Sequence, residues 1–351
     1  MMDPWRDSFQ TGGRNGLIRP RQSLPSLLSS GDRKVPRLTP SRHMIRLTFL
    51  GTSASRPTVG RNVSALALQR EGELMLFDCG EGTQRQMMRF GTGFALDHIF
   101  ITHVHADHYL GVIGLLRTLA LQGREAPMHI YGPRGAEATL TAAVHLGVDR
   151  LAYPVEIREL EPGDRVEREL YDIVALPVRH GTRAVGYALR EHDRPGRFGV
   201  ERARELGIPE GPLFGKLHAG KPVELDGRVI QPEEVVGAPR RGRLVVYTGD
   251  TRPSDRIVAE ARGADALIHD ATFGDEEADR AHETFHSTAR QAGEVARKAE
   301  VRRLYLTHLS ARYSANPAPL EQEARQAFPE AQVAYDGLSV EIGYPQEEEE
   351  A

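Results

Sequence analysis

The sequence predicts an α/β fold in which two β-sheets pack together and helices cover them. Short apolar runs of strand length recur along the 351 residues, first joined by turns as hairpins and later alternating with helical stretches. This mixture favours layered sheets with helices on the outside. Residues 190–243 are rich in Pro and Gly and interrupt this alternation of predicted strands and helices. They are predicted to be an insertion that projects from the main domain.

Each predicted strand is a short apolar run bounded by turn-forming residues. The strands are expected at residues 45–50, 64–69, 73–78, 99–101, 128–131, 171–178, 185–189, 244–248, 266–269, 304–307 and 333–334. Helices are expected at residues 82–90, directly after residues 103–108, at 135–146 and at 288–300. The last of these has its alanines and Val295 on one face, as a helix packed on a sheet requires.

Composition narrows the class of protein. Hydrophobic residues make up 40% of the chain and charged residues 27%, which is ordinary for a globular protein with a large core. The formal net charge of −4 means that any polyanion must be bound by a local basic surface. The single cysteine, Cys79, excludes an internal disulfide, and no run approaches the ~20 apolar residues of a membrane span. We therefore expect a cytoplasmic protein without membrane association.

The two ends of the sequence differ from the middle. Residues 1–43 are rich in Arg, Pro, Ser and Gly without apolar periodicity, and they are predicted to be a disordered N-terminal extension. Met44 is the expected start of the folded domain, which is predicted to span residues 44–343. Residues 344–351 contain four consecutive glutamates and are predicted to be an acidic tail. A functional basic arm is the alternative interpretation of residues 1–43.

The richest cluster of potential metal ligands is the loop at residues 103–108, HVHADH, between a predicted strand and a predicted helix. Side chains two apart on an extended segment point the same way, so His103 and His105 can hold one ion. Asp107 and His108 follow the turn and suit a second ion beside the first. Paired metals generate hydroxide near neutral pH and neutralise a phosphate, so the loop indicates hydrolysis.

Three further predicted strands end on a possible ligand, namely His180, Asp250 and His308. Sites in layered α/β folds collect at strand ends. One ion can take His103, His105 and His180, and the other Asp107, His108 and His308, with Asp250 bridging the two. Nitrogen and oxygen ligands without thiolate suit two Zn²⁺ per chain, and also Mn²⁺ or Fe²⁺. A single His after a strand is more often a capping or surface residue, so the argument depends on the combination.

With these motifs the chain resembles the metallo-β-lactamase superfamily and, within it, the tRNase Z (ribonuclease Z) family. Besides the metal loop, several strings carry the resemblance over about residues 45–340. They are FLGTSA at 49–54, DCGEGTQ at 78–84, His180 followed by Gly186 and Tyr187, GIPEGPL at 207–213, TGDTRP at 248–253 and LTHLSARY at 306–313.

The resemblance implies a four-layer αβ/βα sandwich with a flexible arm, here within residues 190–243. It also implies a zinc-dependent endoribonuclease that removes the 3′ trailer of precursor tRNA, cutting after the discriminator nucleotide to leave a tRNA 3′-hydroxyl and a trailer 5′-phosphate. The family arm grips the tRNA elbow in a homodimer, in which one subunit clamps while the other cuts.

Catalytic roles can be assigned as hypotheses. Asp107 is placed to bind a metal and the attacking water, and so to act as general base. The proton donor for the leaving oxygen should be an imidazole, and His286 matches the family's H-x-T position. The family orients it with a Glu, but here Asp270 stands in that place and is one methylene shorter. The alternatives are that His286 only caps the following helix and that Asp270 bonds only to backbone.

Several supporting roles are also predicted. Asp78 is expected to hold the metal loop by hydrogen bonds, whereas Cys79 is expected to be a core residue. Six histidines are interpreted as structural or surface residues: His98, His129, His145, His192, His218 and His282.

Substrate contacts are predicted at four basic residues. Six basic and three acidic residues between 194 and 221 give a local charge of +3, where Arg194, Arg197 and Lys216 are expected to contact RNA. Arg61 is the expected phosphate or terminal-nucleotide contact beside the site. Family members that reject tRNA already carrying CCA have a Lys near the position of Val59, so this loop departs from their pattern. The alternative interpretation of the basic stretch is a solvent-exposed loop without a binding role.

Two rival functions share these motifs. A small-molecule phosphodiesterase, or a lactone or thioester hydrolase, would use the same metals but would not need the inserted arm. A non-catalytic RNA-binding or metal-sensing module would not need the complete ligand set or the acid candidate His286.

Overall fold

A computed structural model of the chain describes residues 44–147 and 150–345. All of these described residues belong to one compact unit. The predictions of a disordered extension at residues 1–43 and of an acidic run at 347–350 lie outside the described residues. Within the described ranges no helix is long and apolar enough to cross a membrane.

The first sheet has seven strands, in the order β16-β1-β2-β3-β4-β5-β6. Its hairpin part, β16 to β3, is antiparallel, and the part from β3 to β6 is parallel. The strands are β1 (Ile45–Gly51), β2 (Ala65–Arg70), β3 (Glu73–Phe77), β4 (Leu96–Phe100), β5 (Met128–Pro133), β6 (Val155–Leu160) and β16 (Ser339–Ile342).

The second sheet also has seven strands, in the order β15-β14-β13-β12-β9-β8-β7. It is antiparallel from β7 to β12 and parallel from β12 to β15. The strands are β7 (Arg165–Glu167), β8 (Tyr171–Pro177), β9 (Val185–Glu191), β12 (Leu244–Tyr247), β13 (Ala266–Asp270), β14 (Leu304–Thr307) and β15 (Ala331–Val333).

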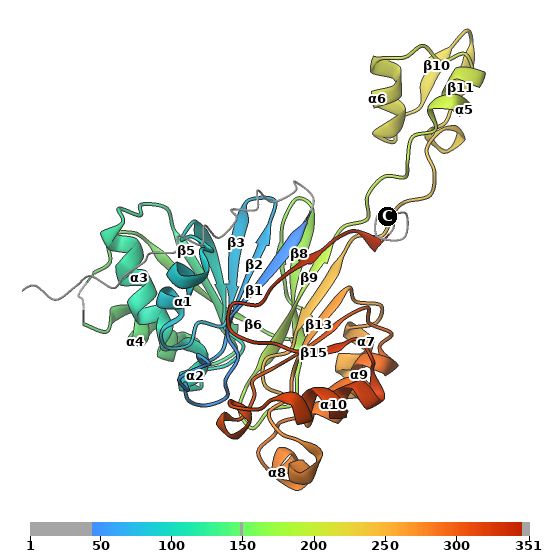
Figure 1. The fold of residues 1–351 in the computed structure, drawn as a ribbon. Helices are drawn as coiled ribbons and strands as arrows, with labels where there is room; N and C mark the ends of the chain where they lie inside the picture. The colour runs from blue at the N-terminus through green and yellow to red at the C-terminus, as the bar shows by residue number, and fades with distance from the viewer. Residues whose placement is uncertain (1–43, 148–149, 346–351) are drawn as a thin grey trace, which may run out of the picture. The chain divides into compact units, whose positions relative to one another are not determined.

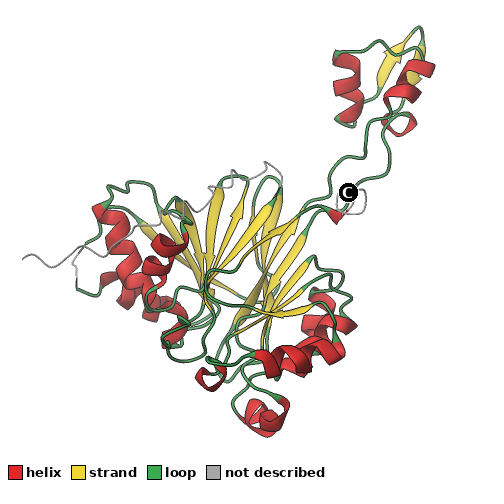
Figure 2. Ribbon diagram, viewed as in Figure 1, coloured by secondary structure: helices red, strands yellow, loops and turns green. Residues whose placement is uncertain are grey.

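The two sheets face each other across a buried core, to which alternate residues of both sheets contribute. Figures 1 and 2 show the sheets between two groups of helices. On the first sheet pack α1 (Thr83–Phe90), α3 (Gly111–Leu121) and α4 (Glu137–His145). On the second pack α7 (Asp255–Glu260), α9 (Ala289–Lys298) and α10 (Ala318–Ala327). The predicted α/β class and the four-layer αβ/βα sandwich are thereby confirmed.

The short elements lie in loops near the strand ends or in the insertion. They are α2 (Ala106–Tyr109), α5 (Val200–Glu205), α6 (Pro212–His218), α8 (Ala278–Glu283), and the 3₁₀ turns η1 (Pro232–Glu234), η2 (Asp275–Glu277) and η3 (Ala311–Tyr313).

The insertion is a small folded arm rather than an irregular excursion. It carries α5, α6 and the two-stranded sheet of β10 (Val223–Leu225) and β11 (Arg228–Ile230). These elements enclose a core of their own, which is made by Ala203, Ile208, Leu217, Val223, Ile230 and Val235. Two chain segments connect the arm to the sheets, and they pair through the bridges Arg194–Arg240 and Phe198–Val236.

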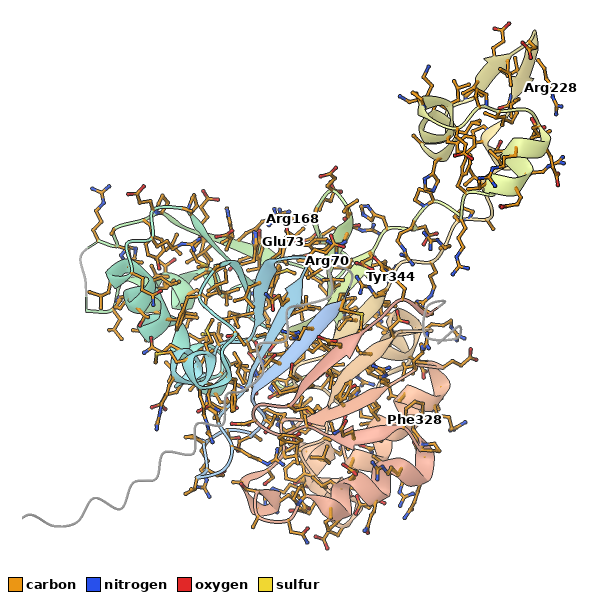
Figure 3. The ribbon with its side chains drawn as sticks, turned by 45° about the horizontal axis from the view of Figure 1, so that its top comes forward. Arg70, Glu73, Arg168, Arg228, Phe328 and Tyr344 are labelled. Atoms are coloured by element: carbon orange, nitrogen blue, oxygen red, sulfur yellow. The ribbon has the colours of Figure 1, made fainter. Side chains whose placement is uncertain are left out.

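A buried ionic cluster closes the base of this arm. Glu191, at the end of β9, and Arg243, just before β12, form a bidentate pair whose Arg243 Nη2–Glu191 Oε1 distance is 2.7 Å. Arg70 of β2 adds a third contact at 2.7 Å, and the Arg243 guanidinium lies 4.0 Å from the Tyr344 ring centroid. Figure 3 labels two members of this cluster, Arg70 and Tyr344. Tyr344 is only 4% exposed. It therefore belongs to the folded domain, and the predicted tail boundary at residue 344 is wrong by at least this residue.

Candidate active site

Four loops converge where strands of both sheets end. The first loop follows β4 and carries His103, His105, Asp107 and His108, and three others follow β8, β12 and β14. Hydrogen bonds join the two sheets at this edge, including Val185 N to Thr102 O and Leu309 N to Thr52 O. Ligand candidates that are far apart in sequence are thus fixed beside one another.

One group of ligand atoms gathers around His105 and Asp250. His103 Nε2 lies 2.9 Å from His105 Nδ1, and His180 Nε2 lies 3.3 Å from the same His105 atom. Asp250 Oδ2 is 3.6 Å from His103 Nε2 and 4.0 Å from His180 Nε2. These four atoms all lie within 4.8 Å of one another, which suits a single metal ion.

A second group forms on the other oxygen of Asp250. Asp250 Oδ1 lies 3.4 Å from His108 Nε2 and 3.2 Å from His308 Nε2. Asp107 Oδ2 lies 3.5 Å from His108 Nε2 and 3.3 Å from His308 Nε2. The structure therefore brings together all seven predicted ligands, with one Asp250 oxygen facing each group.

Two of these ligand atoms lack hydrogen-bond partners, as expected of atoms that bind a cation. Asp250 Oδ1 and His108 Nε2 are buried and have no hydrogen-bond partner among the described residues. Two polar atoms left unsatisfied in a protein interior are costly unless something binds them. A further set of close atoms joins Asp250 and His308 with Asp270 and His286, but the last two are already hydrogen-bonded to each other. The two groups above are thus the ones that fit a metal pair.

The pKa shifts of the buried ligand candidates are also consistent with a metal site. Burial would raise the pKa of Asp250, yet His308, His108 and His103 hold it well below its ordinary value. Burial lowers the pKa of His103 strongly, which leaves the neutral ring that metals bind. Burial acts in the same direction on His108, but Asp250 and Asp78 raise its pKa well above the ordinary value. A metal ion at Nε2 would take the place of that proton.

Asp78 fixes the orientation of two histidines at once. Its Oδ2 accepts a hydrogen bond from His108 Nδ1 at 2.8 Å, so Nε2 of that ring faces the site. Thr102 Oγ1 lies 3.0 Å from Asp78 and 3.0 Å from His103 Nδ1, which links the same carboxylate to the second ring. Tyr247 donates a further hydrogen bond to Asp78 at 2.8 Å. The structure thus places Asp78 where the sequence analysis expected a supporting residue.

Asp270 has the matching role on the second sheet. Its Oδ2 lies 2.8 Å from His286 Nδ1, so the shorter side chain does reach the predicted acid. Its Oδ1 accepts from Thr272 Oγ1 at 2.7 Å, and Thr272 Oγ1 lies 2.9 Å from His308 Nδ1. One carboxylate therefore orients the acid directly and a ligand through a threonine. The alternative that Asp270 bonds only to backbone does not hold.

His286 is not the cap of α9. Thr288 caps that helix, accepting from Gln291 N at 3.2 Å in a capping box. Burial favours the neutral ring of His286, but the Asp270 carboxylate raises its pKa to about 9. The ring also borders a cavity of about 230 Å³ that is lined by Ser55, Arg56, Phe273 and Arg280 among others. The imidazole of His286 is thus held beside the ligand groups and open to that cavity, and its Asp270 partner favours the protonated form.

Two further predictions concern Cys79 and the six histidines that were expected to lie outside the metal site. Cys79 is fully buried among the apolar residues beneath α1 and α3, and burial raises the pKa of its thiol to about 12. None of the six histidines interpreted as structural or surface residues joins a ligand group within the described part of the chain.

Sequence reasoning missed Thr102, Thr272 and Ser55. Ser55 N donates to Asp107 Oδ2 at 2.7 Å and so holds the predicted general base. The close position of Thr272 behind Asp270 was a usable signal. Thr102 and Ser55 gave none, because serine and threonine are common in loops.

Backbone geometry at Gly249 completes the site. This residue has a φ of 59°, and a Cβ there would lie 2.7 Å from the Thr102 side chain. Only glycine fits such a left-handed position against a neighbouring loop. The tight turn carries Asp250 between the two ligand groups.

Comparisons with known proteins agree with this geometry. A family model described as the beta-lactamase superfamily domain matches residues 74–199 and 227–309, and the gap between them lies in the arm. The Ribonuclease Z of Myxococcus xanthus (strain DK1622) is 56% identical over 301 residues, which are 85% of this chain and 98% of that protein. The Ribonuclease Z of Gemmatimonas aurantiaca (strain DSM 14586 / JCM 11422 / NBRC 100505 / T-27) is 58% identical over 302 residues, 85% of this chain and 96% of that protein.

The chain belongs to the ribonuclease Z family. Among solved structures, human tRNase Z, short form, has a TM-score of 0.62 at 28% identity, covering 85% of this chain and 99% of that one. A metallo-beta-lactamase fold protein from Bacillus subtilis has a TM-score of 0.61 at 19% identity, with 85% and 99% coverage, and supports the fold alone. The resemblance stated from the sequence motifs is thereby confirmed.

The prediction that Arg61 contacts the substrate is wrong for this member of the ribonuclease Z family. Arg61 is only 7% exposed, and its Nη1 donates to Thr52 Oγ1 and to the carbonyl of Ala334, both at 2.7 Å. A guanidinium used in this way links Thr52 to the chain segment after β15 and is not available to bind a phosphate. The loop of residues 56–60 lines an open hollow of about 850 Å³ together with Ala311, Ser314 and Ala315.

The charge of +3 over residues 194–221 is offset by acidic residues elsewhere in the arm. Nine basic and eight acidic residues lie between 192 and 242, a net charge of +1. Arg204 pairs with Glu210 at 2.7 Å and Arg202 with Glu205 at 2.9 Å. Arg194 lies over the Tyr344 ring at the base of the arm, whereas Arg197 and Lys216 are exposed.

Proposed function

We propose that this chain is a binuclear metal-dependent endoribonuclease that removes the 3′ trailer from precursor tRNA. It cuts after the discriminator nucleotide and leaves a 3′-hydroxyl on the tRNA and a 5′-phosphate on the trailer. The observation that carries the proposal is the arrangement of seven ligands with one Asp250 oxygen toward each group. Membership of the ribonuclease Z family supports the choice of substrate.

Two Zn²⁺ ions, or Mn²⁺ or Fe²⁺ in their place, would supply a hydroxide nucleophile and neutralise the scissile phosphate. His103, His105 and His180 would hold one ion, and Asp107, His108 and His308 the other, with Asp250 between them. Asp107 is fixed by Ser55 N and lies at the partly exposed side of its group, where it can accept the proton of the attacking water.

The departing 3′-oxygen requires a proton. His286 carries one on the side of the site that opens to the 230 Å³ cavity, and the Asp270 carboxylate holds the opposite ring nitrogen at 2.8 Å. This pairing fixes the tautomer and leaves Nε2 to give its proton to the leaving group. After the bond breaks, Asp270 stabilises the ring until it is protonated again.

The arm is the proposed site of tRNA binding, with Arg197 and Lys216 as contacts to phosphates and Arg194 at its base. A homodimer, in which one subunit's arm holds the tRNA that the partner cuts, is part of the same proposal. So is a cytoplasmic location. A small-molecule hydrolase on the same scaffold would need the metal ligands but not a separately folded arm with its own core.

The test compares a precursor tRNA carrying a 3′ trailer with bis(p-nitrophenyl) phosphate. Wild-type protein is assayed as purified, after chelation, and after the return of zinc or manganese, beside Asp250→Asn. We expect both activities to disappear with the metals and with Asp250→Asn, and the precursor to be cut far more efficiently. Hydrolysis of the small ester without cleavage of the precursor would refute the proposal.

A further inference from the structure

An unusual aromatic residue lies directly beside the proposed acid. Phe285 precedes His286 and adopts a φ of 63°, in the left-handed region. A bulky residue is a rare occupant of this region, where Gly or Asn costs less. The strained conformation has a local use, because the Phe285 carbonyl lies 3.2 Å from His180 Nδ1 and orients that ligand.

This use of the backbone does not explain the aromatic ring. Gly or Asn would offer the same carbonyl with less strain. Core packing does not explain the ring either, because Phe285 is 36% exposed. A phenylalanine thus occupies a costly backbone conformation with about a third of its surface open to solvent.

An arginine lies on this ring. The Arg252 guanidinium carbon is 3.9 Å from the Phe285 ring centroid, and Arg252 is held in turn by the His282 carbonyl. Gly181 leaves room for the ring, since a Cβ at that position would approach Phe285 Cδ2 to 3.2 Å. A planar guanidinium against an aromatic ring offers the two surfaces on which proteins stack unpaired nucleobases.

Phe285 and Arg252 belong to segments that also carry the residues proposed to hold the scissile phosphate. Phe285 adjoins the acid His286, Gly181 adjoins the ligand His180, and Arg252 lies two residues from the bridging Asp250. The 230 Å³ cavity is lined by Thr284 and His286, the chain neighbours of Phe285, whereas the Phe285 ring itself lies outside that lining, against Arg252 and Gly181. A phosphate at the ligand groups would thus hold one of its two nucleosides close to Phe285.

We propose that Phe285 and Arg252 form a stacking platform for the unpaired base of a nucleotide joined to the scissile phosphate. This inference rests on the proposed endoribonuclease function and adds a determinant of where the chain cuts. The base is either that of the discriminator nucleotide or that of the first trailer nucleotide. The platform requires it to be unpaired, because a base within a duplex has no free face.

The test combines protein variants with abasic substrates. Single-turnover cleavage is measured for wild type, Phe285→Tyr and Phe285→Leu on precursor tRNA with all bases present, with an abasic discriminator, or with an abasic first trailer nucleotide. Leu keeps the bulk and the backbone cost of the position but removes the aromatic face, and Tyr keeps that face. Leu121→Ala changes a residue that is 90% exposed on α3 and serves as the control.

We expect Phe285→Leu to slow cleavage of the intact substrate roughly tenfold, in the range of a lost base–aromatic stack. One abasic substrate should slow the wild type by a similar factor, and on it Phe285→Leu should cause no further loss. That substrate identifies the stacked base. Phe285→Tyr and Leu121→Ala should behave like wild type.

Equal losses for Phe285→Leu on intact and on both abasic substrates would overturn the platform and assign the ring a purely structural role. Full activity of Phe285→Leu on the intact substrate would overturn it as well. These results leave the proposed function intact, since the wild type still cuts. A metal-loaded wild type that cuts no RNA would instead refute the proposed function, and the platform with it.

Discussion

Two buried carboxylates organise the candidate site at the scale of single residues. Asp78 holds His108 directly and His103 through Thr102, and Asp270 holds His286 directly with His308 through Thr272. Each carboxylate belongs to a different sheet. In the proposed mechanism, Asp270 therefore couples metal binding to proton donation, because it contacts the proposed acid His286 directly and the proposed ligand His308 through Thr272.

Replacing Asp270 tests this coupling. Asp270→Asn keeps the size of the side chain but removes the charge that raises the pKa of His286, so less of the acid is protonated. We expect kcat on precursor tRNA to fall about 10- to 100-fold, the usual effect of losing such a supporting group. Asp270→Glu, which restores the family's residue, should retain more activity than Asn. Wild-type rates for Asp270→Asn would contradict the assignment.

The role of a residue could be predicted where a side chain able to bind a metal directly follows a predicted strand. His180, Asp250 and His308 each follow a strand, and such residues necessarily meet at one edge of the layers. The role of Thr102 arises only from the folded register, so its sequence context does not reveal it, whereas Thr272 follows Asp270 closely enough in the chain to have been noticed. Arg61 was wrongly expected to contact substrate because its acceptors, Thr52 and the Ala334 carbonyl, come from separate parts of the fold.

At the scale of elements, the arm is separable from the catalytic layers. It has its own core, and its two connecting segments pair at Arg194–Arg240 and Phe198–Val236. Removal of residues 194–221 alone would divide that core, because Val223, Ile230 and Val235 would lose their partners. The better excision replaces the whole arm beyond this pairing.

We expect replacement of residues 199–235 by a short Gly-Ser linker to reduce cleavage of precursor tRNA by on the order of 100-fold, because phosphate contacts supply much of RNA affinity. Hydrolysis of bis(p-nitrophenyl) phosphate should fall far less, since all seven ligands lie outside the arm. Rates for the two substrates are compared with wild type. A parallel loss on both substrates would argue that the arm supports the fold rather than the RNA.

The ionic cluster at the base of the arm makes stability depend on pH. Burial alone would raise the pKa of Glu191, but hydrogen bonds from Arg243 and Arg70 hold it below its ordinary value of 4.5. A lowered folded pKa gives stability that is fully present above the unfolded value. That stability is lost as the pH falls through the folded pKa.

Glu191→Gln should therefore lower the free energy of unfolding by about 3–5 kcal/mol at neutral pH, the cost of leaving buried cations unpaired. The difference in melting temperature between wild type and variant should shrink as the pH falls from about 4.3, the ordinary pKa of a glutamate, toward the lowered pKa of Glu191 in the folded protein. Thermal melts from pH 3 to 7 measure this. An equal difference at every pH would mean that the charge of Glu191 contributes nothing.

Elements with strong apolar patterns were predicted, and weak ones were not. β14 was predicted at its observed bounds. β6, β7 and β16 were missed because they are short or alternate with charged residues, so that neighbouring strands determine their structure. α10 was missed because it buries only Leu320 and Ala324 and so has a weak apolar face. The arm was predicted as an insertion without its internal fold, since its helices have six and seven residues.

The whole molecule assembles its site from both halves. The first sheet contributes the loop from His103 to His108, and the second contributes His180, Asp250 and His308. The ligand set is therefore complete only when the two sheets are packed. The sequence motifs and the family resemblance predicted this architecture, whereas the sharing of a tRNA between two subunits stays a prediction.

Mixing two inactive variants tests that sharing. Asp250→Asn keeps the arm but lacks the bridging ligand, and the arm-excised chain keeps the ligands. If one subunit clamps the tRNA that its partner cuts, a mixture that exchanges subunits should recover a substantial part of wild-type cleavage, up to about one quarter if half of the dimers are mixed and one of their two sites works. A mixture no more active than its components would favour an arm that serves its own subunit.

The most direct test maps both products of precursor tRNA cleavage by metal-loaded wild-type protein at nucleotide resolution. Direct attack of an activated water with His286 protonating the 3′-oxygen predicts one cut after the discriminator nucleotide, a 3′-hydroxyl on the tRNA and a 5′-phosphate on the trailer. A 2′,3′-cyclic phosphate, or cuts scattered along the trailer, would contradict the account.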